Sequence, residues 1–315
     1  MSFLLRRLGH SLIVLLGVTI LVFAIVHLVP GDPIRIAMGT RFDPEVYAAM
    51  RERAGLDLPL WQQYFSYVAG VVQGDLGVSF RSGETVSSLI AARLPATVSL
   101  AGVAIVVALL ISFPLGVYSA LKHGGPLDSV VRAISQFGVS LPNFWLGMLL
   151  IMLFSSMLGV LPSSGYVPIS SDPGAWFRHV ILPASTVGVV AGSILTRYVR
   201  SSVLETLSQE HVRTANSKGL PRTIVLNRHI VRNALVPVIT VVGTQIASIL
   251  GGVIVVEVVF AWPGLGNLVY NAVSARDYPV LQGAVLFIAL VFLVVNLAVD
   301  LLYAKVDPRI RVEDS

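Results

Sequence analysis

The sequence lacks cysteine altogether and has very few lysines among its 315 residues. The absence of cysteine excludes disulfide bonds, thiolate catalysis and cysteine-ligated metal. A phosphate-binding P-loop requires Gly-Lys followed by Ser or Thr, so that backbone amides, an ammonium and a hydroxyl reach the phosphates and Mg²⁺. None of Lys122, Lys218 and Lys305 is followed by either residue. If ATP drives this protein, another chain must bind it.

Charged residues are scarce as well. They make up 12% of the chain, against about 25% in ordinary soluble domains, whereas 55% of the residues are hydrophobic. This composition predicts an integral membrane protein surrounded by a lipid bilayer. The net charge of +5 fits the arginine-rich loops of such a protein better than a nucleic-acid footprint, so no nucleic-acid partner is expected.

Motifs of hydrolytic enzymes are also missing. The six histidines form no HExxH motif, and no GxSxG sequence occurs. Ser119 and Lys122 reproduce the spacing of serine–lysine enzymes, but the companion SDN and KTG motifs are absent, so we attribute this spacing to chance. We therefore expect that the chain is not an enzyme and has no catalytic, metal-binding or cofactor-binding residues.

Long apolar runs are what the sequence has in abundance. About six of them can cross the roughly 30 Å of hydrocarbon as helices, which predicts an all-α polytopic membrane protein. The first run is too long for a signal peptide and is interpreted as a retained span. In the fourth run, Gly188 and Gly192 have the small-xxx-small spacing that favours close helix packing. The runs are 9–29, 97–121, 134–160, 181–200, 235–260 and 281–304.

The distribution of basic residues predicts the orientation of these spans. Arginines and lysines precede the first run, separate the second from the third, fill the loop between the fourth and fifth, and follow the sixth. Of these residue types, the short loops 161–180 and 261–280 contain only Arg178 and Arg276. Positive charge accumulates on the cytoplasmic side, so both termini are predicted to be cytoplasmic and residues 30–96 external.

The long external loop is patterned. Asp43 and the residues after it are typical of a helix start, and recurring aromatic residues indicate two short amphipathic helices. Trp61, Tyr64 and Arg81 are candidates for contact with an external partner. The alternative is that Trp61 and Tyr64 only pack the loop onto the membrane surface. Glu257 and Trp262, at the outer end of the fifth run, are candidates either for the substrate path or for a structural role.

A basic segment between the fourth and fifth runs is the most distinctive part of the chain. About seven arginines and lysines lie between Arg197 and Arg232. Apolar residues recur at helical spacing up to Val212, and Gly219 with Pro221 then interrupts the pattern. The segment is predicted to form a helix, a sharp turn at Gly219 and a second helix, all on the cytoplasmic face.

Several strings in this order give the chain a specific resemblance. It resembles the permease subunits of ATP-binding-cassette importers of the dipeptide/oligopeptide class. The matching strings in the basic loop are Thr214-Ala215, Lys218-Gly219-Leu220, Arg228-His229 and Arg232-Asn233-Ala234-Leu235. Matching strings elsewhere include Gly74-Asp75-Leu76-Gly77, Trp262-Pro263-Gly264-Leu265-Gly266, Asp277-Tyr278-Pro279 and Asp307-Pro308-Arg309.

The resemblance implies a type I importer permease fold in a bacterial cytoplasmic membrane, with the basic loop as the EAA-type element that couples to an ATPase. Arg213 stands where the general motif has glutamate. The implied partners are a second homologous permease subunit, two ATPase subunits that bind ATP and Mg²⁺, and an extracytoplasmic substrate-binding protein. The implied coupling residues are Arg213, Thr214, Ala215, Lys218, Gly219, Leu220, Arg228, His229, Arg232 and Asn233.

This interpretation divides the chain into four parts and leaves two questions open. The solute could be a dipeptide, a longer peptide, glutathione, a nickel chelate or haem. A self-sufficient secondary transporter is the alternative from another class, although the nearly charge-free spans argue against it. The parts are a first transmembrane helix (1–29), an external loop with short helices (30–96), a five-helix core (97–304) with the coupling loop 205–237, and a cytoplasmic tail (305–315).

Overall fold

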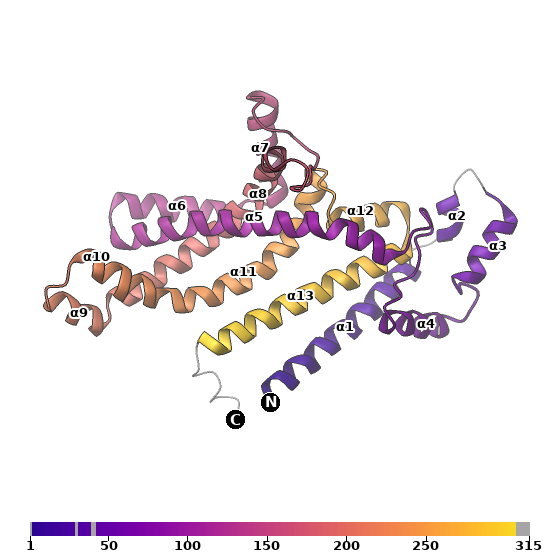
Figure 1. Cartoon of the computed structure of the whole chain (residues 1–315), viewed down its shortest axis with the longest axis horizontal. Coiled ribbons are helices and arrows are strands. Elements are labelled where there is room, and N and C mark those ends of the chain that lie inside the picture. The colour runs from indigo at the N-terminus through magenta and orange to yellow at the C-terminus, as the bar shows by residue number, and fades with distance from the viewer. Residues whose placement is uncertain (1, 29–30, 39–41, 307–315) are drawn as a thin grey trace. The chain divides into compact units, whose positions relative to one another are not determined.

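The computed structural model describes residues 2–28, 31–38 and 42–306 (Figure 1). Within these ranges the regular elements are helices, together with one isolated bridge between Val78 and Thr85, which confirms the all-α prediction. The predicted tail 305–315 lies almost entirely outside the described residues. The elements are α1 (Ser2–Leu28), α2 (Pro33–Met38), α3 (Pro44–Arg53), α4 (Leu60–Val72), α5 (Val86–Leu121), α6 (Pro126–Ser140), α7 (Asn143–Leu150), η1 (Ile151–Met157), α8 (Pro173–Leu207), α9 (Glu210–Ser217), α10 (Arg222–Ile224), η2 (Val225–Val231), α11 (Arg232–Val259), α12 (Leu265–Ala275) and α13 (Tyr278–Val306).

Five of the described helices are long and apolar enough to cross a membrane, and a sixth span is bent. The bent span joins Pro126–Ser140 to Asn143–Met157 at an angle of 105°. An unbroken helix over 134–160 is therefore wrong. The residue before a proline is disfavoured in the α conformation, and Leu141, which precedes Pro142, has extended dihedral angles of −81° and 126°.

The described residues divide into two compact units. One lies within residues 1–97 and 263–294, and the other within 98–262 and 295–315. The predicted core 97–304 thus contributes to both units, and helices α5 and α13 each change unit along their length.

In the first unit, the start of α5 packs with α12 and the start of α13 around Val86, Leu265 and Ala284. Thr97 Oγ1 accepts a hydrogen bond from the Leu265 backbone N–H at 2.8 Å. The predicted helix start at Asp43 is confirmed, because its carboxylate accepts hydrogen bonds from the first backbone N–H groups of α3. Three short helices, α2, α3 and α4, precede α5, where two were predicted.

The second unit is built around α8. The predicted close packing of Gly188 and Gly192 is confirmed, because both glycines face α5. A Cβ at Gly188 would lie 2.7 Å from Val107 Cβ, and one at Gly192 would lie 3.1 Å from the Ala108 carbonyl oxygen. Only residues without a side chain allow the two backbones to approach this closely.

Candidate functional site

The basic segment folds as a helix, a turn and a second helical stretch, as its sequence predicts. Helix α9 is separated from α8 by Ser208 and Gln209, and η2 runs directly into α11. In Figure 1, α9 and α10 lie at the end of the second unit, beyond the first turn of α11. Residues 210–231 thus form a short helical connection between two long helices, α8 and α11.

One face of α9, in this connection, is buried in an apolar cluster. Val212 and Ala215, three residues apart on α9, are 2% and 4% exposed and lie on one face of the helix. They pack with Val203 of α8 and with Ile230 of η2. Helix α9 is therefore packed closely against both α8 and η2. The buried members of the cluster are Ala120, Val199, Val203, Val212, Ala215, Val225, Ile230, Ala234 and Val238.

The end of α9 has the geometry of a Schellman motif. Gly219 has a φ of +70°, as its place in the sequence predicted. Its N–H donates to the Asn216 carbonyl oxygen at 3.0 Å, and the Leu220 N–H donates to the Ala215 carbonyl oxygen at 3.3 Å. A Cβ at Gly219 would meet no atom within 4 Å. Glycine is therefore favoured here by backbone conformation and not by lack of space.

The other side of this helical connection is exposed to solvent and basic. Arg213 forms an ion pair with Glu210 at 3.0 Å, but both side chains are largely exposed, so the pair adds little stability. Ala215 is buried and His229 is half-buried. The exposed residues of the predicted coupling set are Arg213, Thr214, Lys218, Gly219, Leu220, Arg228, Arg232 and Asn233. These residues lie on one short segment and are exposed to solvent.

Asn233 fastens the second helical stretch to α9. Its Nδ2 donates to the His229 carbonyl oxygen at 2.8 Å and lies 3.0 Å from His211 Nε2. His211 Nε2 is also 3.2 Å from the same carbonyl oxygen. Ser202 Oγ of α8 donates to the Ala234 carbonyl oxygen at 2.7 Å. These contacts hold the start of α11 against both α8 and α9.

A buried carboxylate that the sequence analysis did not single out fastens the same end of the unit. Asp128 of α6 has a side chain that is 1% exposed, and Arg200 of α8 binds both of its oxygens. Ser119 Oγ donates to Oδ1 at 2.6 Å, and the Gly124 N–H donates to Oδ2 at 3.1 Å. The contact joins α5, α6 and α8 next to Ala120 and Val199 of the apolar cluster. Its only sequence signal is an acid in the first turn of a helix that starts at Pro126.

Tyr64, Trp61 and Arg81, the residues predicted to face an external partner, have different surroundings within the first unit. Tyr64 faces α1, where its hydroxyl lies 3.0 Å from Thr19 Oγ1. Trp61 is 62% exposed on another face of α4. Arg81 is exposed and lines an open hollow of about 320 Å³ with Ser82 and Asn271.

Glu257 and Trp262, the candidates at and just beyond the C-terminal end of α11, are both fully buried in the second unit. The Trp262 N–H donates to the Glu257 carbonyl oxygen at 2.8 Å. The indole packs edge-on against Tyr166 with ring centroids 4.8 Å apart. The turn between them includes Ala261 at a φ of +48°, a conformation that costs energy in a residue other than glycine.

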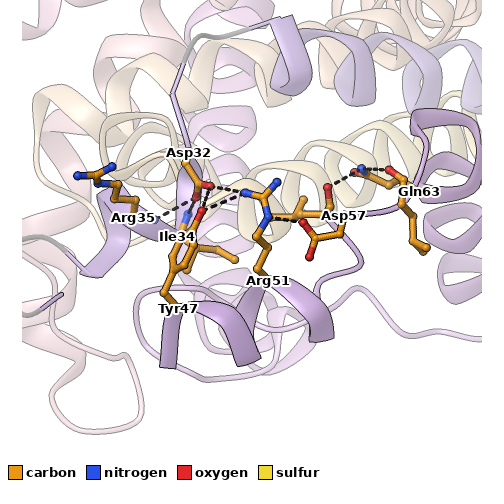
Figure 2. A network of polar contacts seen from close by, with 9 residues as sticks. Asp32, Ile34, Arg35, Tyr47, Arg51, Asp57 and Gln63 are labelled. Atoms are coloured by element: carbon orange, nitrogen blue, oxygen red, sulfur yellow. Dashed lines mark hydrogen bonds and ion pairs between the residues drawn. The ribbon is translucent and has the colours of Figure 1, made fainter. Parts of the chain in front are cut away.

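The segment that contains α2 and α3 holds a second polar network, centred on Asp32 (Figure 2). Tyr47 and Arg51 of α3 each donate to Asp32 Oδ2 at 2.6 Å. Burial raises the pKa of Asp32. The hydrogen bonds from Tyr47 and from the Arg35 and Ile34 N–H groups, with the charge of Arg51, outweigh this and lower the pKa below its ordinary value of 3.8. In the described part of the chain, no group of three histidine or acidic side chains is arranged to hold a metal ion.

Comparison with known families decides where this arrangement belongs. Residues 112–312 match the model of the "binding-protein-dependent transport system inner membrane component", and residues 1–101 match the N-terminal model of the same kind of component. The chain belongs to this family. Its members are membrane subunits of transport systems.

Individual relatives match over nearly the whole chain. The dipeptide transport system permease protein of Escherichia coli is 41% identical, and the glutathione transport system permease protein of Salmonella choleraesuis is 42% identical. A di/tripeptide transport system permease protein of Pseudomonas aeruginosa is 41% identical. In all three cases the alignment covers 99% of both proteins.

Solved structures show the fold. The methionine transporter MetNI in inward-facing conformations matches with a TM-score of 0.59 and 17% identity, covering 70% of this chain and 96% of that one. An amino acid ABC transporter matches with a TM-score of 0.52 and 14% identity, covering 71% and 94%. The fold is that of a type I importer permease, as the sequence strings predict.

Proposed function

We propose that this chain is the permease subunit of an ATP-driven importer of short peptides and forms half of the translocation path. The dipeptide and di/tripeptide permeases, at 41% identity over nearly the full length, support the peptide substrate. The structural observation that carries the proposal is α9, whose underside is buried and whose exposed side presents the basic motif. Such an element is suited to dock a separate motor subunit.

The coupling mechanism follows from the attachment of α9. An ATPase binds the exposed residues Arg213, Lys218 and Arg228. Its movement displaces α9, whose other face is packed into the second unit. Val212 and Ala215 pass that displacement to α8 and η2, since a close-packed interface moves as a body. The long helices then exchange outward-facing for inward-facing access.

The proposal assigns all ATP chemistry to other chains. ATP and Mg²⁺ bind to two partner ATPase subunits, and this chain supplies no catalytic group. A second, homologous permease subunit supplies the other half of the path, and an extracytoplasmic protein delivers the solute. The chain lies in a bacterial cytoplasmic membrane with both termini and α9 on the cytoplasmic side, as the positive-inside bias predicts.

At the outer face, Arg81 is proposed to contact the binding protein. It is exposed beside an open hollow, and a rim charge of this kind affects the rate and salt dependence of docking. Glu257 and Trp262 are proposed to shape the outer end of the path by fixing the turn between them. Tyr64 serves packing against α1, where Thr19 lies beside its hydroxyl.

The test of this function is uptake by the complete complex, reconstituted in lipid vesicles with both ATPases, the second permease and the binding protein. We expect uptake of a labelled dipeptide that requires ATP and this chain, with weaker competition from glutathione than from unlabelled dipeptide. Stronger competition by glutathione would assign the solute class of the glutathione relative. Uptake driven by an ion gradient without ATP would contradict the proposal and support a secondary transporter.

A further inference from the structure

Helix α4 of the external segment has one face packed against α1. Gln63 Oε1 lies 3.0 Å from His27 Nε2, and the Tyr64 hydroxyl lies 3.0 Å from Thr19 Oγ1. The ring of Phe23 meets Tyr64 edge-on at 5.3 Å between centroids and stacks with Tyr67 at 6.5 Å. These aromatic contacts place α4 alongside α1 and not above its end (Figure 1).

The depth of these contacts is informative. The apolar segment of α1 runs from Gly9 to Leu28. At a rise of 1.5 Å per residue, Thr19 lies about 13 Å below Leu28 along the helix axis. The contacts of α4 with His27, Phe23 and Thr19 therefore fall in the outer half of a segment that spans roughly 30 Å of hydrocarbon, with the Tyr64 hydroxyl reaching deepest.

A second face of α4 is apolar and uncovered. Trp61, Phe65 and Val72 are 62%, 64% and 82% exposed, and Ala69 between them is exposed as well. Their spacing of four, four and three residues puts them in one stripe along the helix. An apolar stripe of this size is unfavourable in water, because removing large apolar side chains from water is favourable.

The surroundings of this stripe indicate what covers it. On the neighbouring α1, Leu21, Ile25 and Leu28 are 62%, 56% and 80% exposed, as expected for a span that faces lipid. These three residues lie on the face of α1 opposite its contacts with α4, so α4 packs against a helix whose other face is suited to lipid. Aromatic residues at the level of the headgroups are characteristic of membrane interfaces.

A third face of α4 is polar. Gln62, Ser66 and the C-cap residue Gln73 are spaced four and seven residues apart and form a stripe beside the apolar one. A helix with adjoining apolar and polar stripes lies in the interfacial plane of a bilayer, with one stripe among acyl chains and the other in the headgroup layer.

We propose that α4 is immersed in the outer leaflet of the lipid bilayer, with Trp61, Phe65 and Val72 against acyl chains and Ser66 toward the headgroups and water. The helix then holds the external segment to the membrane beside α1. The choice of leaflet rests on the external placement of residues 30–96 under the proposed function, whereas the lipid contact itself does not.

The test uses nitroxide spin labels at single cysteines, which the cysteine-free chain allows. The matched pair is Phe65→Cys and Ser66→Cys, adjacent residues on different stripes, in the assembled transporter in lipid nanodiscs. Oxygen concentrates in the bilayer and a neutral nickel chelate concentrates in water. We expect the label at residue 65 to collide more often with oxygen and the label at residue 66 more often with nickel. Equal nickel accessibility at both positions would overturn the proposal.

A second pair, Val72→Cys and Gln73→Cys, repeats the comparison at the other end of α4, where Val72 is the most exposed member of the stripe. The binding protein is then added to both pairs. Unchanged oxygen accessibility at residues 65 and 72 supports lipid as the occupant. Low accessibility to both reagents, appearing only with the binding protein, would assign the stripe to that protein. Since the readout is collision and not uptake, failure here leaves the proposed function untouched.

Discussion

Arg200 binds Asp128 through two hydrogen bonds, from Nε to Oδ1 at 2.7 Å and from Nη2 to Oδ2 at 2.9 Å. The two residues come from α8 and α6, 72 positions apart in the chain. The Asp128 side chain is buried and the Arg200 side chain is only 17% exposed. The pair therefore fixes the relative position of α6 and α8, next to Val199 of the apolar cluster that holds α9.

Replacing Asp128 with Asn removes a buried charge and leaves Arg200 uncompensated. Breaking a buried ion pair from one side costs about 3–5 kcal/mol, so we expect a clear fall in the thermal unfolding temperature of the purified subunit or complex. Glu210→Gln is the matched control, because its ion pair with Arg213 is exposed and worth at most about 1 kcal/mol. Equal effects of the two substitutions would show that burial does not set the strength of these pairs.

The close approach of α8 to α5 gives a second stability prediction. A Cβ at Gly188 would lie 2.7 Å from Val107 Cβ and 2.9 Å from the Ala104 carbonyl oxygen. Gly188→Ala should destabilise the protein by about 1–3 kcal/mol, as overpacking does. Gly251→Ala is the control, since a Cβ there meets nothing within 4 Å. A neutral Gly188→Ala variant in thermal unfolding would contradict the close approach.

The residues whose structural role the sequence predicted share one property: that role depends on their neighbours in the sequence. Gly219 ends a helix, Asp43 begins one, and Gly188 with Gly192 forms a short spacing pattern, so each can be predicted from its neighbours. Asp128 was missed because its partner Arg200 is distant in the sequence, and an acid next to a loop that is predicted to be cytoplasmic is expected to be solvated. The packing of Tyr64 on Thr19 depends equally on a long-range contact.

The third span shows a different limit. Its apolar run was predicted as one helix over 134–160 because hydrophobicity alone was weighed. Pro142 disfavours the helical conformation at Leu141 and so indicates a break in the helix. The length of the apolar run was given more weight, but the structure bends there by 105°.

The network around Asp32 predicts how acid affects α3. The folded state lowers this pKa below 3.8, so the carboxylate contributes stability above that pH. The contribution is lost as pH falls through the lowered pKa. Hydrogen exchange of α3, corrected for intrinsic rates, should stay protected from about pH 7 to 5 and lose protection below about pH 4.

Asp32→Asn is the corresponding variant and should show low protection of α3 at every pH. Asp57→Asn is the control, because Asp57 is 61% exposed where it contacts Arg51 and should matter less. Full protection of α3 in the Asp32→Asn variant would rule out this network as its anchor.

The orientation of the chain is tested by labelling single cysteines. Ala48 of α3 and Ser217 of α9 are both exposed, so reagent access and not burial decides the result. An impermeant maleimide added outside intact cells or right-side-out vesicles should label Ala48→Cys and spare Ser217→Cys until the membrane is permeabilised. Labelling of both from outside would contradict the six-span topology.

The central claim is that α9 couples this chain to an ATPase, and Gly219 tests it most directly. Valine at a φ of +70° is strained by about 1–3 kcal/mol, whereas asparagine tolerates that conformation. Neither side chain would clash, because a Cβ there meets no atom within 4 Å. The decisive measurement is peptide-stimulated ATP hydrolysis, with uptake, by complexes reconstituted with Gly219→Val or Gly219→Asn. Loss of stimulation and uptake in the valine variant, with normal assembly and largely retained function in the asparagine variant, is the predicted result. Normal stimulation and uptake with valine would contradict the account.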